Sequence, residues 1–305
     1  MMALSTVSLL SQKSLLEAER GGIYILLTVC QCVKWMFCAT FAAPMIEKRL
    51  LFLLFITCAM CVGRVCAHTL PPLAPQPFTI VLDAGHGGKD PGALGKTGKE
   101  KNINLAVTLA VGKLIEQNLK DVNVVYTRKT DVFVELNERA AIANRAKADL
   151  FVSIHTNALP GKAQGRGSET YTLGMHRAAD NLAVAKRENS AIMLENDYEN
   201  RYEGFDPKSA ESYIIFEFMQ DTYMEQSVKL ATLIQKQFRS AGRPDKGVHQ
   251  AGFLVLRATS MPSCLIELGY ITTASEEAYL LSQRGVDELA RSIYEAIKNF
   301  KATKK

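Results

Sequence analysis

The chain has 305 residues, of which 48% are hydrophobic and 22% are charged, and its formal net charge is +5 at pH 7. These proportions are typical of a globular protein with a packed core and argue against a largely disordered chain. The charge is small and no block of Lys and Arg accompanies it, so composition does not indicate a nucleic-acid partner.

Residues 1–67 are predicted to be an export signal. Lys48 and Arg49 provide a positive start, residues 50–62 form an apolar run, and residues 65–67 offer a cleavage site before His68. A membrane-spanning helix needs about 20 apolar residues, so we expect a cleaved signal, no stable membrane span afterwards, and an exported protein of the periplasm or cell envelope. A retained anchor is the alternative. Because the charged-then-apolar pattern begins only at Met45, our hypothesis is that translation starts there or at Met36 and that residues 1–44 are a mis-assigned start.

Cysteine positions agree with this division of the chain. Six of the seven cysteines lie before residue 67 and the seventh is Cys264, so no disulfide framework is expected in the folded part. Residues 68–77 contain four prolines and are predicted to form a stiff linker. A single catalytic domain is then expected over residues 78–303.

From Phe78 onward, short apolar runs rich in β-branched residues alternate with longer helical patterns. Strands are predicted over residues 78–82, 122–126, 150–154, 168–173, 253–256 and 264–267. Helices are predicted over residues 102–119, 136–147, 227–238 and 287–300. This alternation predicts an α/β fold in which helices cover both faces of a sheet.

Residues 175–226 do not follow this alternation. A helical pattern over residues 178–194 is followed by a polar stretch that contains several aromatic residues. Connections between elements are usually about 2–6 residues long, so a segment of this size indicates a lid or regulatory element. The alternative is a surface insertion without a function.

Three side chains are candidates for binding a metal ion. His86 follows the first predicted strand and His155 follows the third, and residues at the carboxyl ends of neighbouring strands converge on one crevice. Glu100 precedes a predicted helix, where a carboxylate can also serve only as a cap. Two histidines and a glutamate are a familiar ligand set for catalytic zinc. Each signal is weak by itself, because a histidine after a strand is more often structural than a ligand.

Glu267 is the candidate catalytic residue. It lies at the end of the apolar stretch CLIEL, an unusual place for a carboxylate unless it is paired or takes part in catalysis. Beside a metal ion, such a carboxylate would accept a proton from the attacking water and pass it to the departing nitrogen.

Four motifs, in this order, strongly resemble those of the zinc-dependent N-acetylmuramoyl-L-alanine amidases of the cell-separation type. They are IVLDAGHGGKDPGA, the pair KE at residues 99–100, LFVSIHTNA and FLVLRATSMPSCLIELGYIT. The resemblance implies an α/β domain with a mixed sheet of about six strands, flanked by helices, and a helical insertion after the fourth strand. It implies hydrolysis of the amide between N-acetylmuramic acid and L-alanine in peptidoglycan, for wall remodelling or daughter-cell separation. It also implies one Zn²⁺ per chain, held by His86, Glu100 and His155, with Glu267 as the catalytic residue.

The resemblance extends to the long middle segment. Some members carry a helix that lies over the zinc until an activator protein moves it, and residues 175–226 are similar in position and length. Glu188 would be the carboxylate that occludes the zinc. Two other functions stay open: a zinc peptidase that cuts within the stem peptide, and a non-catalytic wall-binding module.

Overall fold

The computed structural model describes residues 77–161, 163–175, 179–217 and 222–304. The predicted export signal and all of the predicted linker except Pro77 lie outside these ranges. Among the described residues, no helix combines the length and the apolar character that crossing a membrane requires. Residues 76–305 form one compact unit.

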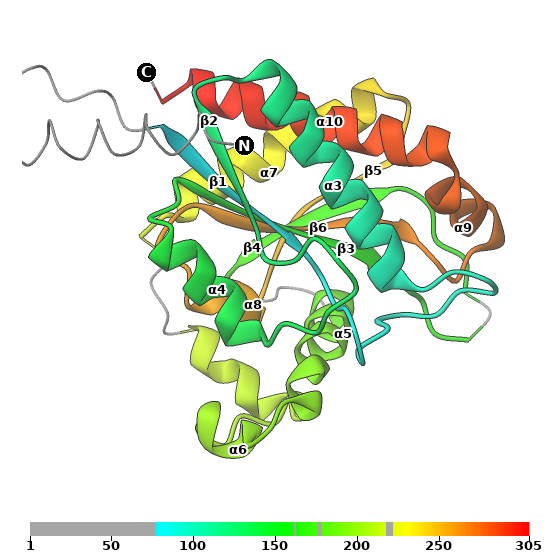
Figure 1. Ribbon diagram of the computed structural model, residues 1–305. Helices are drawn as coiled ribbons and strands as arrows, with labels where there is room; N and C mark the ends of the chain where they lie inside the picture. The colour runs from blue at the N-terminus through cyan, green and yellow to red at the C-terminus, as the bar shows by residue number, and fades with distance from the viewer. Residues whose placement is uncertain (1–76, 162, 176–178, 218–221, 305) are drawn as a thin grey trace, which may run out of the picture. The chain divides into compact units, whose positions relative to one another are not determined.

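Six strands form one mixed sheet in the order β2–β1–β3–β6–β4–β5, which confirms the predicted architecture (Figure 1). The strands are β1 (Phe78–Ala84), β2 (Val122–Tyr126), β3 (Leu150–Asn157), β4 (Ser168–Leu173), β5 (Asp245–Ala251) and β6 (Ser263–Tyr270). β4 runs antiparallel to β6, and the other neighbouring strands are parallel. The start of β4 therefore lies at the same end of the sheet as the carboxyl ends of β3 and β6.

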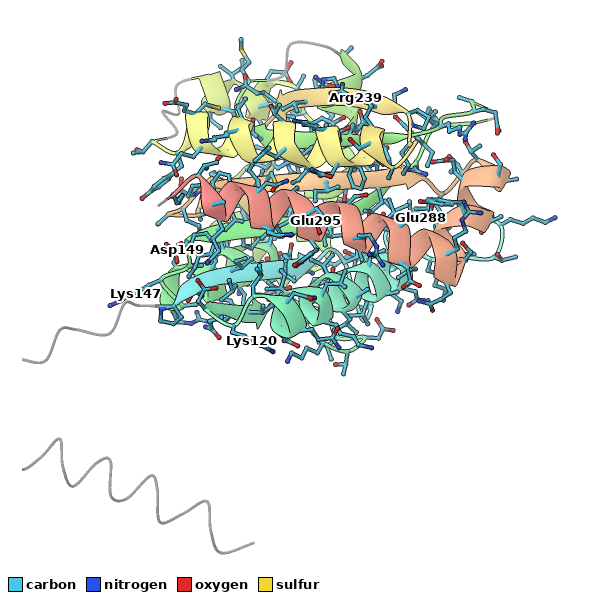
Figure 2. The ribbon with its side chains drawn as sticks, turned by 90° about the horizontal axis from the view of Figure 1, so that it is seen from above. Lys120, Lys147, Asp149, Arg239, Glu288 and Glu295 are labelled. Atoms are coloured by element: carbon cyan, nitrogen blue, oxygen red, sulfur yellow. The ribbon has the colours of Figure 1, made fainter. Side chains whose placement is uncertain are left out.

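Helices cover both faces of this sheet, as predicted (Figure 1). One face carries α3 (Glu100–Asn118), α7 (Met224–Ser240) and α10 (Gln283–Ala302), and α9 (Ala274–Leu281) precedes α10. The other face carries α4 (Leu136–Arg145) and α8 (Leu254–Arg257). Figure 2 shows α7, α10 and α3 side by side from above, with the labelled Glu288 and Glu295 on α10.

The sequence pattern explains these two layers. Successive side chains of a strand point to opposite faces, so Ile80 and Leu82 of β1 join the core beneath α3 and α10, whereas Val81 joins the core on the opposite face. α10 buries Leu289, Ile293 and others at helical spacing, which is the stripe that a surface helix packs on a sheet. Packing on both faces thus fixes the sheet, so side chains at the carboxyl ends of its strands can be held rigidly.

The predicted strand over residues 253–256 is wrong. These residues lie largely in the short helix α8, and the neighbouring strand is β5 (Asp245–Ala251), which was not predicted. A short apolar run does not distinguish a buried strand from a buried helical turn. β5 is an edge strand with the polar sequence DKGVHQA, so it has no apolar run to reveal it. α9 was also missed.

A helical insertion follows β4, which confirms that part of the prediction. It consists of α5 (Ala179–Asn189), η1 (Ser190–Leu194), α6 (Tyr198–Arg201) and η2 (Glu211–Glu217). Phe205, Tyr213 and Phe216 pack edge to face or tilted against one another, with ring centroids 5.2–6.2 Å apart. These buried rings anchor the insertion to the core beside α8.

Candidate active site

The turn after β1 places His86 in an unusual backbone conformation. His86 has a φ of 60°, and Gly87 and Gly88 follow with φ of 130° and 57°. A positive φ at a residue other than glycine persists only when its surroundings enforce it. Here Arg128 and Arg139 donate to the carbonyl oxygens of residues 84–86 at 2.8–3.0 Å. Two buried guanidinium groups therefore hold the turn that presents the His86 ring.

Arg139 is itself fixed by a buried ion pair with Asp83 on β1. Its Nη1 lies 2.7 Å from Asp83 Oδ1, and both side chains are buried. The hydroxyls of Thr127 and Ser153 donate to the same carboxylate at 2.6 Å each. Burial alone would raise the pKa of Asp83, but Arg139 and these hydroxyls together lower it, so the group is a carboxylate in the folded protein.

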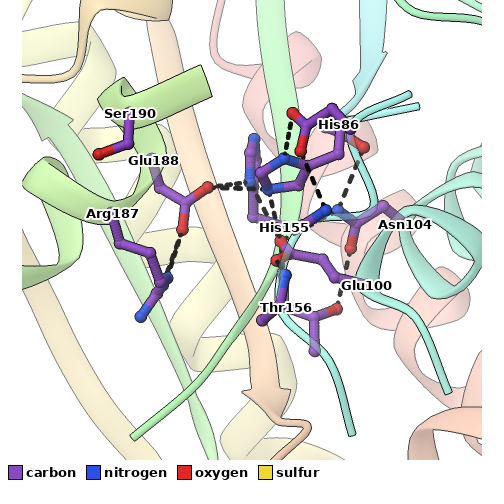
Figure 3. A network of polar contacts seen from close by, with 12 residues as sticks. His86, Glu100, Asn104, His155, Thr156, Arg187, Glu188 and Ser190 are labelled. Atoms are coloured by element: carbon purple, nitrogen blue, oxygen red, sulfur yellow. Dashed lines mark hydrogen bonds and ion pairs between the residues drawn. The ribbon is translucent and has the colours of Figure 1, made fainter. Parts of the chain in front are cut away.

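The three predicted metal ligands meet at one point, although they come from separate parts of the chain (Figure 3). Glu100 Oε1 lies 3.2 Å from both His86 Nε2 and His155 Nδ1. The two imidazole rings are 4.9 Å apart between centroids and nearly perpendicular. His155 lies within β3 rather than after it, and Glu100 is the first residue of α3.

Neighbouring groups orient each of these side chains. Asp90 Oδ2 lies 2.7 Å from His86 Nδ1, so this hydrogen bond orients the ring with Nε2 facing the cluster. Glu100 accepts hydrogen bonds from the backbone amides of Thr156 at 2.9 Å and Ala93 at 2.8 Å. In metal sites, neighbouring hydrogen-bonding groups usually orient the histidine and carboxylate ligands in this way.

Two glycines make room for the cluster. A Cβ atom at Gly85 would lie 2.3 Å from His155 Nε2, and one at Gly92 would lie 2.7 Å from Glu100 Oε2. Any larger residue at either position would therefore displace a predicted ligand.

The cluster could hold a metal ion. Within the described part of the chain, the buried His155 Nδ1 has no hydrogen-bond partner, although it lies close to two carboxylates. Single oxygen and nitrogen atoms of His86, Glu100, His155 and Glu188 all lie within 4.8 Å of one another. A cation at their centre would satisfy the free imidazole nitrogen and balance the two carboxylates, and two imidazoles with carboxylate suit Zn²⁺.

Glu188, at the end of α5, faces the same point. Its Oε2 lies 3.0 Å from His86 Nε2 and 2.8 Å from His155 Nδ1 (Figure 3). Burial alone would raise the pKa of Glu188, but Arg187 and His155 hold it well below its usual range, so it is a carboxylate here. The cavity left beside His86, His155 and Glu188 has a volume of about 10 Å³, which is room for about one water molecule.

Glu267 is fully buried in β6, where it is the direct register partner of His155. Its Oε1 accepts a hydrogen bond from Arg187 Nη2 at 3.1 Å, whereas its Oε2 has no partner among the described residues. Burial raises the pKa of Glu267 well above its usual range; Arg187 opposes the rise, and the charges of Glu188, Glu100 and Glu169 add to it. A carboxyl with a raised pKa is suited to moving protons.

Arg187 contacts both Glu188 and Glu267, and the sequence did not predict a role for it. It lies 2.8 Å from Glu188 Oε1 and 3.1 Å from Glu267 Oε1, and it donates to Asn157 Oδ1 at 2.9 Å. Asp90, Arg128 and Arg139 were missed as well. Asp90 follows His86 within one motif, which is a local signal, whereas Arg187 and Glu267 are 80 residues apart and only folding brings them together.

A mixed α/β sheet that carries a buried His–Glu–His set beside a second carboxylate is typical of metal-dependent hydrolases. The chain belongs to the N-acetylmuramoyl-L-alanine amidase family, whose profile matches residues 80–299. The predicted family and enzyme class are thereby confirmed. The roles of His86, Glu100, His155, Glu188 and Glu267 stay predictions.

Individual relatives agree with this assignment. N-acetylmuramoyl-L-alanine amidase AmiC from Escherichia coli O6:H1 is 33% identical over 232 residues, which are 74% of this chain and 53% of AmiC, so the chain matches about half of that relative's length. An N-acetylmuramoyl-L-alanine amidase of known structure from Clostridium difficile 630 is 28% identical with a TM-score of 0.56, covering 75% of this chain and 100% of that one. The CwlD amidase from Clostridioides difficile, solved in complex with the GerS lipoprotein, is 25% identical with a TM-score of 0.54, covering 74% and 99%.

Proposed function

We propose that this protein hydrolyses the amide between N-acetylmuramic acid and the L-alanine of the stem peptide in bacterial peptidoglycan, and that the reaction requires one Zn²⁺ per chain. The convergence of His86, Glu100 and His155 on one point, beside the buried Glu267, carries the proposal. Family membership supports the substrate, and the unsatisfied nitrogen of His155 supports the metal.

His86 Nε2, His155 Nδ1 and a Glu100 oxygen would hold the ion. A bound Zn²⁺ would polarise the scissile carbonyl and make a neighbouring water molecule more acidic. Glu267 accepts the proton of the attacking water and then delivers it to the amide nitrogen, so that the carbon–nitrogen bond breaks. The products are a lactyl carboxylate on the sugar and a free amine on L-alanine. The raised pKa of Glu267 suits both transfers, because the group can hold the proton between them.

The insertion would keep this site closed until a partner protein moves it. Glu188 lies where a fourth metal ligand or the substrate would bind, and the adjacent Arg187 pairs with the catalytic carboxylate. The insertion, residues 175–226, would therefore block both the metal site and Glu267 through a single turn of α5. An activator protein is the partner that this arrangement requires, and the CwlD structure is an example of an amidase in this family bound to a lipoprotein.

The setting of the reaction follows from the predicted export signal. Residues 1–67 would direct the chain to the periplasm or cell envelope, where its substrate lies, and the activity would serve wall remodelling or daughter-cell separation. A regulated hydrolase suits that setting, because uncontrolled cleavage would weaken the wall.

Digestion of purified muropeptides by the zinc-loaded protein, followed by mass spectrometry, tests the proposal. We expect intact glycan with a free lactyl carboxylate and stem peptides that begin with a free L-alanine amine. Glu267→Ala should release neither product. New amines at other positions would favour a zinc peptidase instead. If the zinc-loaded Glu188→Ala variant also released nothing, the wall-binding alternative would replace the amidase.

A further inference from the structure

The loop between β1 and α3 has to place Glu100 without help from a helix cap. Glu100 is the first residue of α3, and the residue before it is Lys99, whose side chain has no hydrogen-bond acceptor and so cannot cap the helix. Capping side chains usually pair the free backbone amides at a helix start and fix where the helix begins. The position of Glu100 therefore depends on contacts that the loop makes.

This loop is a short hairpin, residues 94–99, that closes directly on Glu100. Leu94 and Lys99 pair as an antiparallel bridge. Next to this bridge, the Glu100 amide donates to the Ala93 carbonyl at 3.0 Å, and the Ala93 amide donates to Glu100 Oε2 at 2.8 Å. A shift of the hairpin would therefore move both the backbone and the carboxylate of Glu100.

A buried carboxylate on α9 holds the tip of the hairpin. Glu277 is 5% exposed, and its Oε1 accepts hydrogen bonds from the backbone amides of Thr97 and Gly98 at 2.7 Å each. The Thr97 hydroxyl donates to the same oxygen at 3.1 Å. Burial alone would raise the pKa of Glu277, but the hydrogen bonds from the loop amides lower it, so the group is a carboxylate here. Hydrogen bonds to a charged acceptor are about twice as strong as neutral ones, so this contact holds the hairpin firmly.

The neighbouring carboxylate on α9 holds a different part of the chain. Glu276 is also buried, and its Oε2 lies 2.7 Å from Arg243 Nη2 and accepts a hydrogen bond from the Gly167 amide at 3.2 Å. Gly167 directly precedes β4. Glu276 thus fixes the start of β4, whereas Glu277 fixes the hairpin before α3.

We infer that Glu277 is a positioning residue for the predicted zinc ligand Glu100. The inference rests on the proposed function, because it requires zinc at the cluster. Glu277 acts through the hairpin, which keeps Glu100 Oε1 facing His86 and His155. Because α9 follows β6, the same contact also ties the loop before Glu100 to the segment after Glu267. Without it, the Glu100 carboxylate is no longer held in place, and the ion loses a firmly placed ligand.

The affinity of the full chain for Zn²⁺, measured by competition with a chelator, tests this inference without requiring turnover. Glu277→Ala should weaken zinc binding about tenfold or more, because loss of a group that orients a metal ligand typically costs about 10–100-fold in affinity. Glu277→Gln should restore most of the affinity, since its amide oxygen can replace Oε1 as the acceptor for the loop amides. Glu276→Ala is the matched control: it removes an equally buried carboxylate from the adjacent residue, and it should bind zinc like wild type.

Thermal unfolding of the zinc-free variants separates positioning from stability. Both alanine variants should lower the unfolding midpoint, but Glu277→Ala alone should weaken zinc binding. Equal zinc affinities of wild type and Glu277→Ala, or an equal loss in Glu277→Ala and Glu276→Ala, would overturn the inference. If Glu277→Ala does not fold, Gly95→Ala decides: its methyl group would lie 2.4 Å from Glu277 Oε1, so it should also weaken zinc binding, and an unchanged affinity would overturn the inference.

This outcome is separable from that of the proposed function. If the wild-type chain binds zinc and cleaves muropeptides, but Glu277→Ala binds zinc equally well, the inference is wrong and the amidase proposal stands. If zinc affinity depends on Glu277 as expected but no amide is cleaved, the inference stands and the proposed reaction is wrong. A wild-type chain that binds no zinc would contradict both.

Discussion

Replacing Glu188 by alanine should raise the basal amidase activity. The Glu188 carboxylate makes two contacts with the predicted zinc ligands, at 3.0 Å to His86 and 2.8 Å to His155. One hydrogen bond to a charged group, such as that between Glu188 and His86, contributes about 1.5–3 kcal/mol, so its loss destabilises the closed arrangement by about that amount. Because 1.4 kcal/mol corresponds to a factor of ten, the open fraction, and with it the basal rate, should rise about 10- to 100-fold.

The assay is the release of labelled stem peptide from purified sacculi by the zinc-loaded full chain, without any activator. Glu199→Gln is the matched control, because Glu199 is an exposed carboxylate on α6 in the same insertion. Zinc content and the thermal unfolding midpoint are measured for each variant. A folded, zinc-loaded Glu188→Ala protein with the basal rate of wild type would refute the idea that α5 closes the site.

Other changes test the remaining parts of the account. Glu267→Ala should abolish turnover while zinc stays bound, whereas His155→Ala should lose the metal, both checked by metal analysis. The acid limb of the activity–pH profile should lie above the ordinary carboxyl range, because burial raises the pKa of Glu267 and only its carboxylate form accepts the proton. Asp83→Asn should lower the unfolding free energy by about 3–5 kcal/mol, since it leaves the buried Arg139 unpaired. Folding lowers the pKa of Asp83, so the wild-type advantage, measured by denaturant titration, should be full above about pH 4 and should decline as the pH falls further.

The sequence predicts that His86, Glu100 and His155 converge, because local features define their positions, and the structure brings them together; their role as metal ligands stays a prediction. His86 and His155 lie at or near the ends of apolar strands, and neighbouring parallel strands bring such positions to one edge of the sheet. The conformation of His86 could not be predicted in the same way. Its positive φ depends on Arg128 and Arg139, which lie in later segments with ordinary polar sequences.

Tertiary contacts explain what the sequence did not reveal. Arg187 lies within a helical pattern in which a basic residue normally faces solvent. Only the packing of α5 against β5 places its side chain within reach of Asn157 and Glu267. β5 was missed for a related reason. As an edge strand it does not need an apolar face on both sides, and its register against β4 is fixed by backbone pairing. The prediction assigned a strand to residues 253–256, whereas the strand in this part of the chain is β5.

The central claim is that His86, Glu100 and His155 bind a single zinc ion beside Glu267. Anomalous diffraction at the zinc edge, from crystals of the zinc-loaded protein, tests it most directly. The account predicts one strong peak between His86 Nε2, His155 Nδ1 and the Glu100 carboxylate. A zinc peak bound elsewhere on the molecule, or no peak at this position after zinc loading, would contradict it.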